Sequence, residues 1–322
     1  MDSLLAAGIG LVAALVLTPL ARRVAMHFAI VDRPGDLKTQ RVPIAYLGGV
    51  AVCIAAIAGP LIAAHPLVLV PTIAALSLGL ADDLRPVPVP FRIITEVGIA
   101  IAAALSVPGP LLVQVATGVL ALGLLNAVNL LDGQDGLASG VGAVAAIGFA
   151  IIGGAASPVG FALAGALIGF VVYNRPPARI YLGDAGAYLI GTTLALLPAL
   201  TDHASTRWST WWAVPLLVGV PVADTAIAII RRVRLRQPLL SGDRSHVYDQ
   251  LVDRGLSIGQ STMMCIGVQC ILTVIGIGAT ETAPALALAI TATGTAAITL
   301  VAWRGGLLGG SSPDDRPIAE RE

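Results

Sequence analysis

Carboxylates gather at the ends of long apolar runs in this 322-residue chain. Each of these acids directly precedes or follows such a run, and they are Asp82, Asp83, Asp132, Asp135, Asp184 and Asp243. A charge in hydrocarbon costs about 2.5–3.5 kcal/mol on insertion scales, so acids at membrane edges usually serve a function. Because most of the Lys and Arg residues lie in the same segments, the pattern predicts a site for a divalent cation and phosphate groups.

The elements that position these acids are predicted to be membrane helices. Hydrophobic residues make up 56% of the chain and charged residues 12%, and the mean hydropathy is +0.87. Soluble domains average about 45–50% and about 25% for the same two classes. The three cysteines lie in apolar runs and are read as small buried hydrophobes. The first run lacks a basic start and a cleavage site, so it is expected to stay as a helix.

Eleven stretches approach the length of about 20 apolar residues that a spanning helix needs. They are 4–21, 46–64, 66–80, 93–107, 110–129, 139–155, 158–173, 185–200, 211–230, 260–279 and 283–303. The third and fourth are short, which leaves ten spans as an alternative. The sequence predicts an all-α polytopic bundle of 10–11 spanning helices in a single domain, 1–303, followed by a polar, disordered tail over 304–322.

The distribution of positive charge predicts the orientation. With the N-terminus outside and the C-terminus in the cytoplasm, 18 of the 19 Lys and Arg residues lie inside and only Arg207 lies outside. Such an excess marks the cytoplasmic side. Five inner loops therefore carry the polar residues, at about 22–45, 81–92, 129–138, 174–184 and 231–259.

The first inner loop carries Lys38 and Arg41 before Gly48 and Gly49. Backbone N–H groups at the start of a helix, with cations nearby, would suit a phosphate. Two alternatives stay open: the cations could meet lipid headgroups, and the glycines could allow close helix packing.

The second inner loop places Asp82 beside Asp83. Two adjacent acids at a helix end suit magnesium, which proteins hold through one or two carboxylates plus substrate phosphates. An equally weighted alternative is that they pair with Arg85 and Arg92.

The third inner loop is the most specific indication of a functional site, because it contains acids and no basic residue. Asn129, Asp132 and Asp135 are spaced three apart, so they share one face in helical turns. Gly133 and Gly136 allow a tight backbone that brings both acids to one cavity.

The last two inner loops contribute single polar residues. Asp184 begins a helix, where the dipole favours an anion, or alternatively serves as its N-cap. Tyr181 offers a flat face to a nucleobase, or belongs to the interfacial aromatic belt. His246 closes a polar turn and could contact phosphate. Asp224 lies about two turns inside its helix, so it is expected to face the bundle.

Five motifs occur in order over residues 31–257: a first loop with Lys, Pro and Gly-Gly, then G-x-x-D-D, N-x-x-D-G-x-D-G-L-A, aromatic-x-G-D-x-G and D-R-x-H. This series resembles the polyprenyl-phosphate N-acetylhexosamine-1-phosphate transferase superfamily, glycosyltransferase family 4. Its undecaprenyl-phosphate N-acetylglucosaminyl 1-phosphate transferases and phospho-N-acetylmuramoyl-pentapeptide-transferases move a sugar 1-phosphate from a UDP-sugar to polyprenyl phosphate and release UMP.

The resemblance implies a role for each matching residue. Asp83 and Asp184 would bind Mg²⁺, for which Mn²⁺ could substitute, and Asp184 would be the principal ligand. Asp82 would be either a base or a group that positions the acceptor, and His246 would also be catalytic. The substrate-binding residues would be Lys38, Asn129, Asp132, Asp135, Asn174, Tyr181 and Arg244.

Departures from the family pattern concern the donor sugar more than the reaction. Val247, Tyr248 and Asp249 follow His246 where further histidines are common, which favours N-acetylglucosamine over the muramoyl-pentapeptide alternative. A polytopic transporter, the alternative of another class, would have ionisable residues near mid-membrane and repeated halves. The expected partners are a UDP-sugar, polyprenyl phosphate and the bilayer, without nucleic acid; a homodimer stays open. The expected location is a bacterial-type inner membrane, with the active site on the cytoplasmic face.

Overall fold

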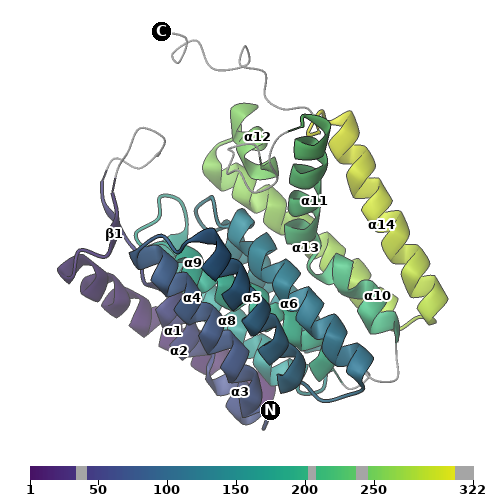
Figure 1. The fold of residues 1–322 in the computed structure, drawn as a ribbon, viewed down its shortest axis with the longest axis horizontal. Coiled ribbons are helices and arrows are strands. Elements are labelled where there is room, and N and C mark those ends of the chain that lie inside the picture. The colour runs from purple at the N-terminus through teal and green to yellow at the C-terminus, as the bar shows by residue number, and fades with distance from the viewer. Residues whose placement is uncertain (34–41, 202–207, 237–245, 309–322) are drawn as a thin grey trace.

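The computed structural model describes residues 1–33, 42–201, 208–236 and 246–308. Within these ranges the chain is almost entirely helical (Figure 1). The α-helices are α1 (Asp2–His27), α2 (Gly48–Ala56), α3 (Ala58–Ile62), α4 (Leu69–Leu84), α5 (Val89–Ser106), α6 (Leu111–Leu131), α7 (Leu137–Ile152), α8 (Ala156–Asn174), α9 (Gly183–Leu196), α10 (Trp208–Leu217), α11 (Gly219–Arg234), α12 (Val247–Asp253), α13 (Ile258–Thr280) and α14 (Pro284–Arg304). Two short 3₁₀ helices, η1 (Pro66–Val68) and η2 (Leu197–Leu200), extend α4 and α9.

The membrane spans confirm an all-α polytopic protein, but fewer helices in the described residues pass the length test than the ten or eleven spans predicted. In the described residues, eight helices are long and apolar enough to cross a membrane, or nine if α10 and α11 form one span. Shorter apolar helices occupy Gly48–Ile62 and Leu137–Ile152, so each of the eleven predicted stretches does contain a helix. The two stretches expected to be short, 66–80 and 93–107, pass the length test as Pro66–Leu84 and Val89–Ser106.

Helix α9 lies at the centre of the bundle. Its span is 94% buried, against 22% for α1 and 17% for α14. It packs against α2, α4 and α6, while α8 packs against α1 and α7. Because α4 and α6 both pack against α9, the polar residues at the ends of these three helices are brought to one place.

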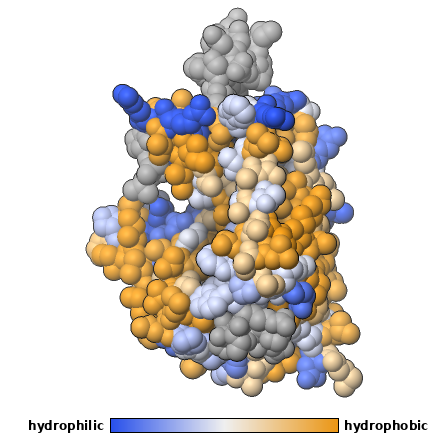
Figure 2. Space-filling model, turned by 90° about the vertical axis from the view of Figure 1, so that its right-hand side faces the viewer, coloured by the Kyte–Doolittle hydropathy of each residue, from blue (hydrophilic) through white to orange (hydrophobic). Residues whose placement is uncertain are grey.

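The outer surface fits a hydrocarbon environment. Large apolar side chains such as Leu105, Leu111, Ile271, Val274 and Val301 are more than half exposed. Figure 2 shows hydrophobic residues over the middle of one face, with hydrophilic residues gathered toward its upper rim. Exposed apolar surface on this scale is typical of a lipid-facing protein rather than of a soluble one.

A small β-structure joins the first and fourth loops. Strand β1 (Val31–Asp32) pairs antiparallel with β2 (Ile44–Ala45), and Ala45 forms a parallel bridge to Ile180. Gly48 and Gly49 donate backbone hydrogen bonds of 3.1 and 3.0 Å to the carbonyls of Tyr181 and Leu182. The expectation that these N–H groups receive a phosphate is therefore wrong, because they already have partners.

Close packing explains the glycine pair instead. A Cβ on Gly49 would meet the backbone of Gly186 at the start of α9. A Cβ on Gly48 would meet the ring of Phe170 at 2.6 Å. The glycines thus allow α2 to lie directly against α9, which was the alternative reading.

Between α10 and α11 the chain bends by 69° within the membrane-spanning region. Pro221 has no N–H group, so the carbonyl of Leu217 has no helical donor four residues later. The side chain of Gln269, from α13, lies in the gap. Its Nε2 donates to the carbonyls of Leu217 at 2.9 Å and Leu216 at 3.4 Å, and its Oε1 accepts the N–H of Val220 at 2.9 Å. One amide thereby satisfies the backbone groups that the break exposes, as the absence of water in hydrocarbon requires.

Replacing Gln269 with leucine is expected to destabilise the protein by at least about 2 kcal/mol. The substitution leaves Val220 N–H and two carbonyls without partners, at about 1–3 kcal/mol for an unsatisfied buried group. Thermal unfolding of the purified protein in detergent measures the effect. The matched control is Gln114→Leu in α6, whose side chain is only partly buried and which should change stability little. Equal unfolding temperatures for the two variants would contradict this role of Gln269.

Candidate active site

Two acids from different helices meet at the junction of α4 and α9. Asp83 lies in the last turn of α4 and Asp184 in the first turn of α9. The helices approach this closely because Gly79 is a glycine: a Cβ there would collide with the backbone of Asp184. Gly183 has φ +72°, and a Cβ on it would lie 2.5 Å from Oδ2 of Asp83. Glycine is therefore required on both sides of the acid pair.

Asp83 caps α9 from the neighbouring helix. Its Oδ1 accepts the N–H of Asp184 at 2.9 Å and its Oδ2 accepts the N–H of Ala185 at 3.1 Å. These are among the first N–H groups of a helix, which have no partner inside the helix. The N-cap position itself is Leu182, so the alternative that Asp184 is the N-cap is wrong. Capping by Asp83 leaves the carboxylate of Asp184 for other contacts.

Three more polar side chains surround Asp184. Asn129, near the end of α6, donates its Nδ2 to Oδ1 of Asp184 at 2.7 Å. The carboxylate of Asp82 is close enough for its charge to act on Asp184. Asp132 follows α6, and burial together with the negative charges of Asp184, Asp83 and Asp135 raises its pKa well above the usual range. Acids gathered in this way favour the binding of a cation.

A second polar network, only partly expected from the sequence, adjoins the acids. Arg92 lies 3.9 Å from Oδ2 of Asp82 and 3.5 Å from Oε1 of Glu96, measured from its NH1 and Nε atoms. Asn126 donates to Oε2 of Glu96 at 3.0 Å, and Val87 N–H donates to Oδ1 of Asp82 at 2.6 Å. The pairing of Asp82 with Arg92 was expected as an alternative. The sequence signal for the rest of this network was Glu96, because a carboxylate inside an apolar run requires partners. In the structure Glu96 is buried, with 4% of its surface exposed.

The third and fourth loops are fastened to each other. Asp135 accepts the N–H of Ala178 at 2.8 Å, and burial raises its pKa in spite of that bond. The Asn174 Oδ1 accepts the N–H of Gly136 and the hydroxyl of Ser139, while its Nδ2 donates to the carbonyl of Ile180. Asn174 is thus bound into the loop structure, and its predicted contact with substrate stays a prediction.

Two tyrosines lie beside the acids. The rings of Tyr46 and Tyr181 are 6.1 Å apart and inclined at 53°. Burial, followed by the charge of Asp32 and those of Asp83 and Asp184, raises the pKa of Tyr46. Burial and the charges of Asp135, Asp32 and Asp132 raise the pKa of Tyr181. Tyr181 therefore lies near Asp132 and Asp135, and its predicted contact with a nucleobase stays a prediction. Tyr46 is a further aromatic group that sequence reasoning did not select.

The predicted residues of the fifth loop are only partly within the described chain. His246 is buried and lies 2.6 Å from Asp224, measured from Nδ1 to Oδ2. Asp224 faces the bundle, as its depth in the helix predicts. Lys38 and Arg244 lie outside the described residues, so their predicted roles stay predictions.

The oxygen ligands of the acidic site fit a hard cation such as Mg²⁺, but they do not form a complete cage. Carboxylate oxygens from Asp83 and Asp184 are the ligands that Mg²⁺ prefers. In the described ranges, no three His, Cys, Asp or Glu side chains form a group that could hold a metal ion alone. Mg²⁺ bound through one or two carboxylates plus substrate phosphates does not need such a cage. The residues therefore fit a metal that is shared with a phosphorylated substrate.

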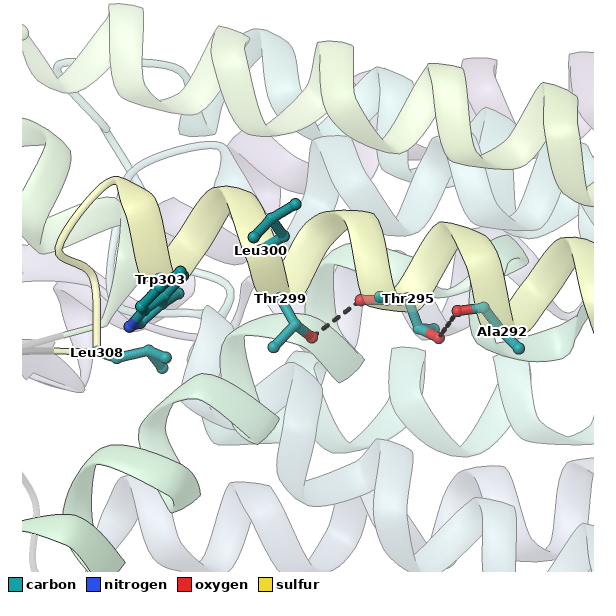
Figure 3. Close-up of a pocket in the computed structure, with 7 residues that line it drawn as sticks. Ala292, Thr295, Thr299, Leu300, Trp303 and Leu308 are labelled. Atoms are coloured by element: carbon teal, nitrogen blue, oxygen red, sulfur yellow. Dashed lines mark hydrogen bonds between the residues drawn. The ribbon is translucent and has the colours of Figure 1, made fainter.

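A groove of about 550 Å³ lies elsewhere, along α14 (Figure 3). Its lining is apolar or hydroxylated, from Ala292, Thr295, Ala296, Thr299, Leu300, Trp303 and Leu308. Among the described residues, its lining includes no charged group that could meet a phosphate. The lining of this groove suits hydrocarbon rather than phosphate.

Fold and site together define a multi-pass membrane protein with an acidic centre built from α4, α6 and α9. Residues 65–201 match the model of glycosyl transferase family 4. This match covers less than half of the chain and, with the curated relatives below, confirms the resemblance to the polyprenyl-phosphate sugar-1-phosphate transferase superfamily found in the sequence. The match contains Asp82, Asp83, Asn129, Asp132 and Asp184.

The curated relatives are transferases of the kind that the sequence resemblance indicated. The chain is 28% identical over 296 residues to the probable undecaprenyl-phosphate N-acetylglucosaminyl 1-phosphate transferase of Bacillus subtilis, covering 84% of this chain and 82% of that protein. It is 30% identical over 187 residues to the decaprenyl-phosphate N-acetylglucosaminephosphotransferase of Mycolicibacterium smegmatis, with coverages of 51% and 45%. It is 34% identical over 146 residues to a phospho-N-acetylmuramoyl-pentapeptide-transferase of Synechococcus, with coverages of 41% and 38%.

Proposed function

We propose that this protein transfers N-acetylglucosamine 1-phosphate from a UDP-sugar to polyprenyl phosphate, forming polyprenyl-diphosphate-sugar and releasing UMP. The observation that carries the proposal is the convergence of Asp83, Asp184, Asn129 and Asp132 at one end of three adjoining helices. The alignment over most of the chain with the Bacillus subtilis protein supports the choice of sugar. The alignment with the Synechococcus pentapeptide-transferase, which supports the alternative muramoyl-pentapeptide donor, is shorter.

The reaction joins two negatively charged partners. An oxygen of the acceptor phosphate attacks the sugar-bearing phosphorus, and the bond from that phosphorus to the oxygen of UMP breaks. Repulsion between phosphates opposes the approach, and a bound Mg²⁺ would reduce it by neutralising charge. Asp184 and Asp83 would hold the ion.

The other residues of the site would orient the substrates. Asn129 would fix the carboxylate of Asp184 through their hydrogen bond. Asp82 is already bound to Val87 N–H and lies near Arg92, which supports the role of positioning the acceptor over that of a base. Tyr46 and Tyr181 would offer ring faces to the uracil, since bases stack on aromatic side chains.

The test is an assay of the purified full chain with Mg²⁺, polyprenyl phosphate and a panel of UDP-sugars. We expect UMP and a lipid-linked product with UDP-N-acetylglucosamine, loss of both with EDTA, and recovery on adding Mg²⁺. Product with only UDP-N-acetylmuramoyl-pentapeptide would replace the donor. No product with any donor would favour a transporter or an inactive scaffold.

We also propose that the acidic site faces the cytoplasm across a bacterial-type inner membrane. The positive-inside distribution of Lys and Arg supports this orientation. The same assay tests it in sealed vesicles, because a UDP-sugar does not cross the bilayer. Product is expected in inside-out vesicles, and product confined to right-side-out vesicles would reverse the orientation.

A further inference from the structure

Asp224 and His246 form a buried pair between α11 and the start of α12. Their exposed fractions are 3% and 5%, and the distance from Oδ2 to Nδ1 is 2.6 Å. The other oxygen of Asp224, Oδ1, accepts the N–H of Val247 at 2.8 Å. Both oxygens of the carboxylate therefore accept a hydrogen bond from the segment that carries His246.

This arrangement determines which imidazole nitrogen carries a proton. An ionised carboxylate only accepts hydrogen bonds, so the Nδ1 atom that faces Oδ2 must be the donor. Nε2 is then the nitrogen that can change its role. A carboxylate that fixes the tautomer and orientation of a histidine in this way is a common positioning device at active sites.

The flat face of the His246 ring also packs against an aromatic neighbour. Tyr248 stacks on it with the ring planes 5° apart and the centroids separated by 5.5 Å. The Tyr248 hydroxyl donates to the carbonyl of Leu130 at 3.1 Å, next to Asn129 in α6. Gly133 leaves the space for this contact, because a Cβ there would collide with the Tyr248 hydroxyl. The imidazole is thereby fixed relative to the helix that carries Asn129.

We propose that Asp224 is a positioning residue that fixes the Nδ1–H tautomer of His246 and so presents Nε2 to the sugar-phosphate donor. The inference rests on the proposed function and on the catalytic role that the family resemblance implies for His246. Asp224 is not in contact with the reacting atoms. Its effect on transfer passes through the histidine.

The sharpest variant is Asp224→Asn. Asparagine has one acceptor oxygen, whereas His246 Nδ1–H and Val247 N–H both require an acceptor. If the amide oxygen turns to Val247, its NH₂ group faces Nδ1 and forces the proton to Nε2. Asp224→Glu keeps two acceptor oxygens and is the variant that should restore the pair.

The first readout is the nitrogen NMR spectrum of the purified full chain labelled in its histidines. The sequence contains four histidines, and His246→Gln assigns the signal of interest. We expect the Nδ1–H tautomer in the wild type, a shift to the Nε2–H tautomer in Asp224→Asn, and its return in Asp224→Glu. The signals of the other histidines should not change.

The second readout is transfer activity. Loss of an orienting partner costs about 10–100-fold at sites where it has been measured. We expect kcat/KM to fall by that amount in Asp224→Asn and to recover at least in part in Asp224→Glu. The matched control, Asp253→Asn, changes an exposed acid at the end of α12 and should keep wild-type activity.

The proposal is overturned if Asp224→Asn keeps the Nδ1–H tautomer, or if it loses activity while the His246 signal is unchanged. It is also overturned if Asp224→Glu is no more active than Asp224→Asn. Failure of the proposed function gives a different result: the wild type then transfers no sugar phosphate, while the tautomer shift in Asp224→Asn is still observed.

Discussion

Asp184→Asn is expected to reduce turnover by at least about a thousandfold while the protein stays folded and membrane-inserted. Removing the charge weakens the hold on Mg²⁺, and a loss of about 4 kcal/mol of charge stabilisation corresponds to that factor. The fold is expected to survive because the amide oxygen can still accept from Asn129, and Asp83 still accepts the first N–H groups of α9.

The measurement is UMP release over a series of Mg²⁺ concentrations, beside the unfolding temperature in detergent. Asp253→Asn is the matched control, since it removes one exposed carboxylate away from the site. Turnover of Asp184→Asn equal to that of the control would remove Asp184 as a metal ligand. An unfolding temperature well below that of the control would instead assign Asp184 a structural role.

Gly183→Ala is expected to lower turnover by about a hundredfold and stability by about 1–3 kcal/mol. The residue has φ +72°, where a side chain is strained, and its Cβ would lie 2.5 Å from the Asp83 carboxylate. Asp83 would have to move, which breaks its bonds to the N–H groups of Asp184 and Ala185. One methyl group thereby disturbs both the metal site and the cap of α9.

Gly98→Ala is the matched control for this substitution. Gly98 lies in α5, and no atom is within 4 Å of the position where its Cβ would be. Activity should be unchanged there, and stability should stay equal or rise slightly because alanine favours a helix. If the two variants have the same activity, the contact between Gly183 and Asp83 does not constrain the site.

Hydropathy alone predicted where the helices lie. All eleven stretches contain helix, and the central place of the acids Asp83, Asp132 and Asp184 follows from their positions at the ends of α4, α6 and α9. Composition could not give the interruptions, because a broken span such as 211–230 is as apolar as a continuous one. The break depends on Pro221 together with a partner 48 residues away in sequence, and only the packing of α13 brings Gln269 there.

The sequence indicated which residues gather at the candidate site better than it indicated what each residue does there. Asp83 was expected as a metal ligand, yet the structure adds that it caps α9, a contact between residues 101 apart. Gly48 and Gly49 were expected either to bind an anion or to allow close helix packing, and the structure shows packing, of Gly49 on α9 and of Gly48 on Phe170 of α8. The spacing of residues along one helix shows which of them share a face, but it does not show which neighbouring helix packs against that face. Tyr46 and the Arg92–Glu96–Asn126 network were missed for this reason.

The contact of Gln269 with the break between α10 and α11 also has a consequence for biosynthesis. The break around Val218 is made about 50 residues earlier than the side chain that satisfies it, since α13 follows α10 and α11 in the chain. Unpaired backbone groups are not tolerated in lipid. The backbone groups around Val218 therefore gain this partner only after the ribosome has delivered residues 258–280, when α13 packs against α10 and α11.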